Sequence, residues 1–167
     1  ARQASNLTKT KVTAIDSDTT DQGLSFQVIR AAELAKEGKS AEEILKEVQK
    51  VQENTTLYIG ISTLDNLVKG GRISRTTGLL SSVLNIRVVM NFTHGELIPV
   101  AKGRGQKTFD KWFNNLKKEL KALPNVRQIG ISHADAAELA QEFKEGLQEL
   151  FPDMNIPVLH TNPVIAT

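Results

Sequence analysis

The sequence has no cysteine among its 167 residues, so disulfide bridges, thiolate zinc sites and a cysteine nucleophile are excluded. Long apolar runs are also missing: none approaches the roughly 18 residues that a membrane-spanning helix needs. The net charge is only +2, too small to indicate nucleic-acid binding by itself. These absences favour a cytoplasmic protein with no nucleic-acid partner.

The densest basic stretch is Lys117-Lys118-Glu119-Leu120-Lys121, which contains an acid and falls on a predicted helix. We interpret it as a solvated helix face. The alternative is a nucleic-acid patch made by Lys117, Lys118, Lys121 and Arg127, and salt-dependent binding would distinguish the two.

Strand-like runs alternate with amphipathic helices along the chain, which predicts an α/β protein with a mixed sheet flanked by helices. The strand-like runs are 11–15, 56–61, 86–92, 96–100, 127–132 and 156–160. Residues 86–92 and 96–100 flank Thr93-His94-Gly95 and predict a hairpin, so the sheet is not purely parallel.

Six helices are expected from spacing and capping signals; two of them are short, Leu64 to Lys69 and a second through Leu79, Leu80 and Val83, and four are longer. The first follows Gly23 and places Leu24, Val28, Ala31 and Ala35 on one apolar face. The second begins at a capping box from Ser40 to Glu43. The third, over 106–121, carries the stripe Phe109, Trp112, Phe113, Leu116 and Leu120, and the fourth is capped by Asp135 with Leu139, Phe143, Leu147 and Leu150 inward.

The chain is expected to be a fragment of two domains. Residues 1–54 are too short to bury a core of their own, which indicates the remnant of an N-terminal domain, with residues 55–167 as a C-terminal α/β domain. There is no initial methionine, residues 1–5 resemble the tail of a helix, and residues 163–167 end in a strand-like run. We therefore expect truncation at both ends.

One motif, Leu64-Asp65-Asn66-Leu67-Val68-Lys69-Gly70-Gly71-Arg72-Ile73-Ser74, has two interpretations. A double glycine followed by Arg72 and Ser74 between two helices could hold an anion through free amides, a hydroxyl and a guanidinium. The alternative is a helix–turn–helix corner with an exposed Arg72 and an N-cap Ser74, and spacing alone favours it.

This motif also resembles the DegV family, in which Leu-x-x-Leu-x-x-Gly-Gly-Arg-Ile-Ser precedes an apolar helix and a hairpin. Further matches are Leu84-Asn85-Ile86, Arg104, Ile131-Ser132-His133-Ala134-Asp135, Asp16-Ser17, Gly23 and Ala31-Ala32. The resemblance covers nearly the whole chain. Two departures, Arg87-Val88 where the family has Lys-Pro and Ser25 where it often has glycine, lie outside the motif.

The resemblance implies a two-domain α/β protein that buries a long-chain fatty acid between its domains and presents it to a separate fatty acid kinase. The protein would be a carrier and not an enzyme, would need no cofactor, and could contact a membrane transiently. The ligand-binding residues expected from it are Arg72, Ile73, Ser74, Ile86, His133 and Asp135. The resemblance also places Arg72 where the kinase docks, against the alternative of a solvated arginine.

The family's carboxylate donors are absent from this sequence. They lie in a Ser-Gly-Thr turn, expected before Ala1, and in a His-Thr-Gly-Pro-Gly motif, expected after Thr167. His160-Thr161-Asn162-Pro163 lacks both glycines, so that role is not transferred to His160. We therefore expect the chain alone to bind fatty acid weakly or not at all.

His133 and Asp135 keep two interpretations. They could stand at a ligand crevice, where open α/β sheets place their sites. The favoured alternative is a hydrogen-bonded histidine beside Asp135 as the N-cap of a capping box that reaches Glu138. His94 is expected to be only a turn residue, and three scattered histidines do not favour a metal site. A rival hypothesis is an α/β enzyme that uses Arg72 and His133 on a small phosphorylated substrate.

Overall fold

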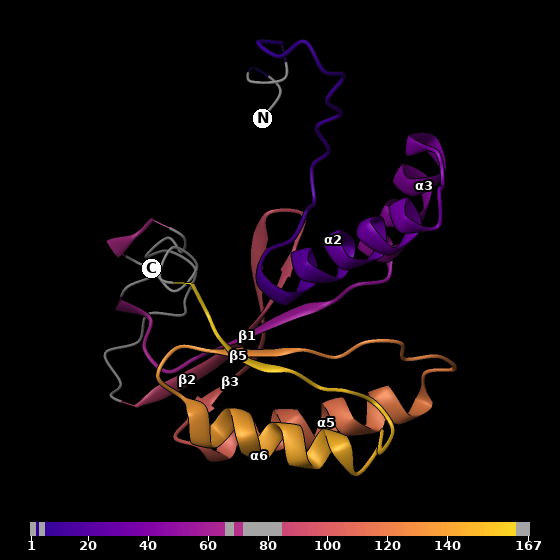
Figure 1. Cartoon of the computed structure of the whole chain (residues 1–167). Coiled ribbons are helices and arrows are strands. Elements are labelled where there is room, and N and C mark those ends of the chain that lie inside the picture. Colours follow the sequence, from indigo (N-terminus) through magenta and orange to yellow (C-terminus); the bar gives the residue numbers. More distant parts are fainter. Residues whose placement is uncertain (1–2, 4–5, 66–68, 72–84, 163–167) are drawn as a thin grey trace.

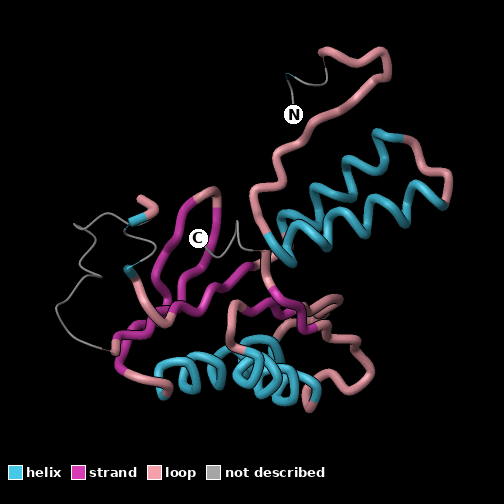
Figure 2. Tube along the Cα trace, turned by 60° about the vertical axis from the view of Figure 1, so that its left-hand side comes forward, coloured by secondary structure: helices cyan, strands magenta, loops and turns pink. Residues whose placement is uncertain are grey.

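The computed structural model describes residue 3 and residues 6–65, 69–71 and 85–162. Its elements, in chain order, are α2 (Asp21–Lys36), α3 (Ala41–Glu53), β1 (Leu57–Ile61), β2 (Ile86–Thr93), β3 (Glu96–Arg104), α5 (Lys107–Ala122), β4 (Ile131–His133), α6 (Ala137–Gln148) and β5 (Val158–His160). Figure 1 shows α5 and α6 side by side on one side of the strands, with α2 and α3 as a separate helical hairpin. The 60° rotation in Figure 2 keeps this arrangement.

The sheets confirm the mixed α/β prediction. Strands β1, β2 and β3 form an antiparallel sheet in that order, and β4 pairs with β5 in parallel. The predicted hairpin is β2–β3, closed by Thr93 opposite Glu96. His94 and Gly95 both have positive φ, 49° and 75°, as the tight hairpin turn with matching strand twist requires. β4 and β5 are shorter than the runs predicted for them.

The α2–α3 hairpin has the predicted capping box. The backbone N–H of Glu43 donates to the Ser40 hydroxyl at 3.3 Å, and the Ser40 N–H donates to the Glu43 carboxylate at 2.9 Å. Gly38, at φ 78°, ends the turn after α2 because glycine has no steric cost there. The capping box and the glycine turn could both be predicted from the sequence because each depends only on residues that are close together in the chain.

The apolar face predicted for α2 is wrong. Leu24 and Val28 are 40% and 58% exposed, whereas Gln22 and Gln27 are buried. The polar side chains face inward because they bond to other segments: Gln27 donates to the Ser17 carbonyl at 2.8 Å, and Gln22 to the hydroxyl of Ser132 at 3.0 Å. Specific hydrogen bonds therefore override the hydrophobic spacing.

Residues 11–15 do not form the predicted strand. Val12 and Ile15 are each 51% exposed, and no described strand offers them a backbone ladder. A β-branched run needs a hydrogen-bonded neighbour to become a strand.

Two apolar clusters hold the rest together. Leu64, Val88 and Met90 are buried on one side of the antiparallel sheet. The stripe of α5 packs toward α6, where Phe113, Leu147 and Ile156 form the second cluster. The rings of Phe113 and Phe143 stack with centroids 4.2 Å apart. These contacts confirm the predicted inward faces of both helices.

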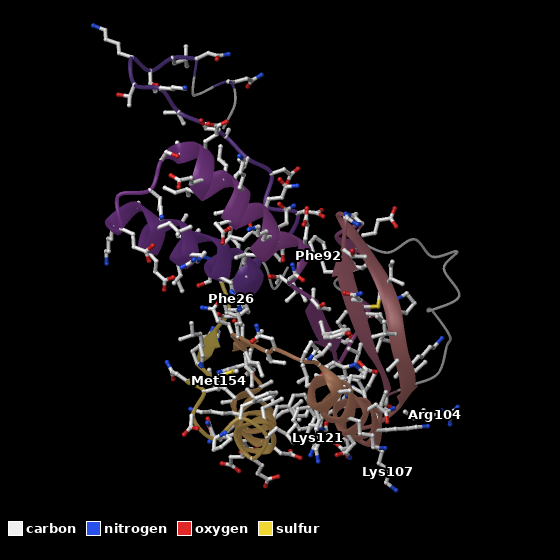
Figure 3. All side chains as sticks on the ribbon, turned by 90° about the vertical axis from the view of Figure 1, so that its right-hand side faces the viewer. Phe26, Phe92, Arg104, Lys107, Lys121 and Met154 are labelled. Carbon is white, nitrogen blue, oxygen red and sulfur yellow. The ribbon has the colours of Figure 1, made fainter. Side chains whose placement is uncertain are left out.

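The basic stretch on α5 is only partly solvated. Lys118 and Lys121 are exposed, as predicted. Lys117 is half-buried, and its ammonium lies 5.0 Å from the centre of the Phe113 ring. Lys107 extends away from the body of the molecule at the other end of the helix (Figure 3).

Candidate ligand cavity

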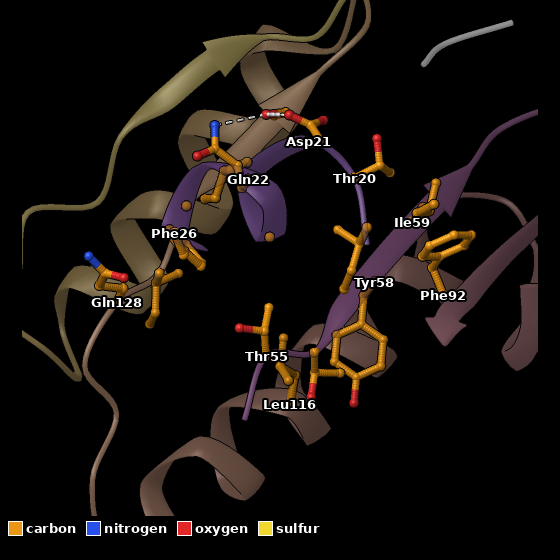
Figure 4. A pocket seen from close by; sticks show the side chains of 18 of the residues that line it. Thr20, Asp21, Gln22, Phe26, Thr55, Tyr58, Ile59, Phe92, Leu116 and Gln128 are labelled. Carbon is orange, nitrogen blue, oxygen red and sulfur yellow. Dashed lines mark hydrogen bonds between the residues drawn. The ribbon is translucent and has the colours of Figure 1, made fainter. Parts of the chain in front are cut away.

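A cavity of about 1990 Å³ lies between β1, the inner faces of α5 and α6, the start of α2 and the ends of β4 and β5. Figure 4 shows Phe26, Tyr58, Ile59 and Leu116 around it, with Asp21 and Gln22 at one side. The backbone of residues 123–132 forms another wall. The cavity is therefore bounded by both halves of the chain.

The wall formed by β1, α5 and α6 is aromatic and aliphatic. Trp112 packs edge-on against Tyr58, with ring centroids 5.4 Å apart, and lies 6.1 Å from the ring of Phe143. Leu116 and Leu139 extend this wall along α5 and α6. Such a surface gains free energy when an apolar ligand displaces water from it.

Burial raises the pKa of the Tyr58 phenol, and the nearby carboxylate of Glu119 adds a smaller effect in the same direction. Both causes disfavour the phenolate, because the cavity wall is poorly hydrated and already faces a negative charge. Tyr58 therefore presents a neutral hydroxyl to the cavity at physiological pH.

The opposite rim is polar. The Asp21 carboxylate accepts hydrogen bonds from the hydroxyls of Ser132, at 2.8 Å, and Thr161, at 3.0 Å. Ser132 also accepts from Gln22. These residues bring the start of α2 to the ends of β4 and β5, where parallel strands place ligand crevices.

His133 stands on this rim and lines the cavity. Its Nδ1 accepts the backbone N–H of Ala136 at 3.4 Å, so the neutral ring carries its proton on Nε2. The ring of His160 lies edge-on to it, with centroids 5.2 Å apart, and its Nδ1 faces the Thr161 carbonyl at 3.1 Å. His133 thus lines the cavity with a ring whose Nδ1 is already engaged.

The predicted capping box at Asp135 is wrong. Helix α6 begins at Ala137, its N-cap is Ala136, and no side chain caps it. Asp135 lies one residue before the N-cap and has φ 51°, a left-handed conformation. The ring nitrogen of His133 accepts the amide of the N-cap residue Ala136, which is a different amide from the one that a capping Asp135 would accept.

The other predicted ligand residues are distributed differently. Ile86 packs against the cluster of Leu64, Val88 and Met90 and is not among the residues that line the cavity. Asp135 is not among them either, although its neighbours Ala134 and Ala136 are. Arg72, Ile73 and Ser74 lie outside the described residues. Ligand contact by all of these residues stays a prediction.

Sequence reasoning missed the aromatic wall and the Asp21 rim. Trp112 and Leu116 were visible as a helical stripe, but a stripe that lines a cavity has the same spacing as one that fills a core. Asp21 gave no signal, because its partners Ser132 and Thr161 lie 111 and 140 residues further along the chain.

No group of three or more metal-ligating side chains occurs among the described residues. No helix in this part is long and apolar enough to cross a bilayer. The arrangement suits a ligand with a long apolar body and a polar end.

The fold and the cavity define an α/β protein with a large, partly open candidate ligand cavity that has an apolar wall and a polar rim. The model of the DegV family, described as an uncharacterised protein family, matches residues 1–167, and the chain belongs to this family. A DegV domain-containing protein of Streptococcus pneumoniae is 53% identical over 167 residues, covering 100% of this chain and 59% of the relative. The chain therefore spans about three-fifths of the length of such relatives.

Solved structures of the family agree with the fold. The S. pneumoniae fatty acid kinase (Fak) B3 protein, loaded with linoleic acid, is 28% identical with a TM-score of 0.79, over 96% of this chain and 58% of that one. DegV of Bacillus subtilis, a fatty acid binding protein, is 25% identical with a TM-score of 0.80, over 96% and 57%. Fatty acids are thus ligands of proteins with this fold.

Proposed function

We propose that this chain belongs to a cytoplasmic carrier that binds a long-chain fatty acid and presents it to a separate fatty acid kinase. The cavity between β1, α5 and α6 carries the proposal. Its volume of about 1990 Å³ exceeds the roughly 300–1,000 Å³ of ordinary small-molecule pockets. The acyl chain would lie along the wall of Tyr58, Trp112 and Leu116.

Burial of the acyl chain supplies the affinity. Each methylene removed from water contributes up to about 0.8 kcal/mol, so an acyl chain of ordinary length needs few polar contacts. The carboxylate needs fixed donors, because an unpaired buried charge costs several kcal/mol. Within the described residues the Nε2–H of His133 is one donor, whereas the Asp21 carboxylate repels a like charge.

The resemblance assigns the remaining donors to motifs that this sequence lacks, and kinase docking to Arg72. We accordingly propose that residues 55–167 supply most of the acyl-chain wall, and that residues 1–54 belong to a second domain. In the full-length protein the Ser-Gly-Thr and His-Thr-Gly-Pro-Gly motifs would contribute the rest of the carboxylate site. The linoleic acid with which the S. pneumoniae protein is loaded supports a fatty acid ligand, and the name of that protein, fatty acid kinase B3, supports the kinase partnership.

The test uses a full-length DegV protein that contains these 167 residues. Organic extraction of the purified protein and mass spectrometry should recover long-chain fatty acid, and addition of the cognate kinase with ATP should give acyl phosphate. Extracts that repeatedly hold no fatty acid would contradict the carrier function. The 167-residue chain by itself is expected to bind weakly, and nanomolar affinity for it would show that the absent motifs matter little.

A further inference from the structure

Residues 17–22, which we call the strap, lead into α2 and include its first two residues. They lie at the rim of the cavity. Two of them, Asp18 and Asp21, have left-handed backbones with φ of 48° and 50°. Residues other than glycine rarely adopt this region, and they stay there only where surrounding contacts hold them. Both aspartates have such contacts, and the two contacts lie on different parts of the molecule.

The first anchor joins the strap to the β2–β3 hairpin. The Asp18 carboxylate lies 2.7 Å from Nδ1 of His94, at the tip of the turn. The His94 side chain is 86% exposed, so water competes for this contact. His94 was expected to be only a turn residue, and the structure shows that it also holds a segment 76 residues away.

The second anchor joins the strap to β4 and β5. The Asp21 carboxylate accepts from Ser132 and Thr161, and Gln22, which is buried, donates to Ser132. Further support comes from Gln27, whose amide donates to the Ser17 carbonyl. This end has several partly buried hydrogen bonds, so it is held more firmly than the exposed contact at Asp18.

The cavity lies between the two anchors. Thr20, Asp21 and Gln22 line it from the strap, Gly95 and Glu96 from the hairpin, and Ser132 and Thr161 from the strand ends. In Figure 4, Thr20 and Asp21 lie on one backbone segment, with Gln22 at one side of the cavity and Phe92 at the other. The strap is therefore part of the rim that a ligand must pass.

We propose that Asp18 and Asp21 are positioning residues that hold the strap across the rim, and that release of the Asp18–His94 contact admits and frees the ligand. The Asp21 network acts as the fixed end, and the exposed Asp18 contact opens first. This inference rests on the proposed function, because the ligand in question is the fatty acid.

The hairpin sequence allows a sharp variant. His94→Asn keeps a residue that tolerates positive φ and creates Asn-Gly, the preferred pair for this turn, but its shorter side chain does not reach Asp18. Thr93→Ser is the matched control, since it changes a side chain at the same hairpin tip that is not among the residues lining the cavity. Asp18→Asn and the double variant complete a double-mutant cycle.

Two measurements on the full-length protein test the inference. Hydrogen exchange should show faster exchange of the amides of residues 17–20 in His94→Asn and not in Thr93→Ser. Stopped-flow displacement of bound fatty acid should then show dissociation about two- to fivefold faster, the range expected from an exposed polar contact. The Asp18→Asn/His94→Asn double variant should dissociate fatty acid little faster than either single variant, because both substitutions remove the same contact.

Unchanged dissociation in His94→Asn overturns the proposal, whether or not its strap amides exchange faster. Equal acceleration in Thr93→Ser overturns it too, because disturbance of the hairpin tip and not loss of the anchor would then be responsible. A wild-type protein that holds no fatty acid would contradict the proposed function. A wild-type protein that binds fatty acid, but whose dissociation rate does not depend on His94, would contradict only the role of the strap.

Discussion

Ser40 and Glu43 form the capping box at the start of α3, and its contribution to the free energy of unfolding can be measured. The Ser40 hydroxyl satisfies an amide that has no partner within the helix. Ser40→Ala should therefore lower the free energy of unfolding by about 1 kcal/mol, whereas Ser40→Thr, which keeps the hydroxyl, should cost much less. Urea unfolding followed by circular dichroism measures both, and equal losses would show that the hydroxyl is not what stabilises the helix start.

Glu43 gives this pair a pH dependence. Its hydrogen bonds from the backbone N–H of Ser40 and then from the Ser40 hydroxyl lower the pKa of the Glu43 carboxyl below its usual 4.5. The folded state therefore binds a proton less readily than the unfolded state at this group. The stabilisation is complete above about pH 4.5 and is lost as the pH falls through the lowered pKa.

Comparison of the wild type with Glu43→Gln isolates this effect. The gap in stability between them should be widest near neutral pH and should narrow below the usual carboxyl pKa. Glu42→Gln, one residue earlier in the same first turn, is the matched control without a Ser40 contact. A gap that stays constant from neutral to acid pH would contradict the assignment.

Tyr58 is the one tyrosine of the chain, so its titration is spectroscopically clean. Burial, with Glu119 second, raises its pKa above 10.0 in the folded state. The stability that depends on the neutral phenol is present below pH 10 and is lost as the pH rises through the raised pKa. Phenolate absorbance should appear at higher pH in the folded chain than in urea, and coincident curves would show that the ring is solvated.

Local signals predicted some residues well and others wrongly. The Ser40–Glu43 box formed because all of its partners lie within one turn of helix. Asp135 had an equally good local pattern, but it adopts a left-handed backbone and the helix begins two residues later, at Ala137. The hydrogen-bonded histidine expected beside it is present, since His133 accepts the Ala136 amide, but residue types alone did not indicate the backbone conformation of Asp135.

At the scale of elements, Gly146 marks where α6 meets α5. A Cβ added there would lie 2.8 Å from Cε1 and 3.2 Å from Cζ of Phe113. Phe113 is 7% exposed and stacked on Phe143, so its ring has little room to move. The close contact explains why a helix interior tolerates glycine at this point.

Gly146→Ala is therefore expected to destabilise the chain. Alanine would gain roughly 0.5–1 kcal/mol of helix propensity, but overpacking typically costs 1–3 kcal/mol, so the net loss should be about 1 kcal/mol. Glu145→Ala, at the preceding exposed position of α6, is the control. Chemical denaturation measures the difference, and a Gly146→Ala chain more stable than the wild type would mean that the helices separate easily.

The same scale explains which elements could be predicted. The stripe on α5 matched the structure because Phe109 and Phe113 pack on apolar neighbours close by. The stripe on α2 failed because long-range hydrogen bonds from Gln22 and Gln27 set the helix rotation. Periodicity identified both as helices, but only tertiary contacts decide which side of α2 faces inward.

For the whole molecule, the mixed α/β class followed from the alternation of elements, whereas the cavity did not. The cavity needs β1, α5, α6 and the strap in their relative positions, and residue spacing carries no information about empty space between elements. The motif at Arg72 indicated the family without locating the cavity wall. Only the folded arrangement shows that Tyr58 and Trp112 face a common space.

Trp112 provides the last test, because it is the single tryptophan and lies on the cavity wall. A long-chain fatty acid that fills the cavity should replace water around the indole, so fluorescence of the full-length protein should change with saturation. Leu116→Asp should weaken binding at least a hundredfold, since it buries an unpaired charge beside the acyl chain. Asn114→Asp adds the same charge to the exposed side of α5 and should leave the affinity unchanged. If both variants bound equally well, the ligand would have to lie elsewhere, and the wall of Tyr58, Trp112 and Leu116 would then be only a loosely packed part of the core.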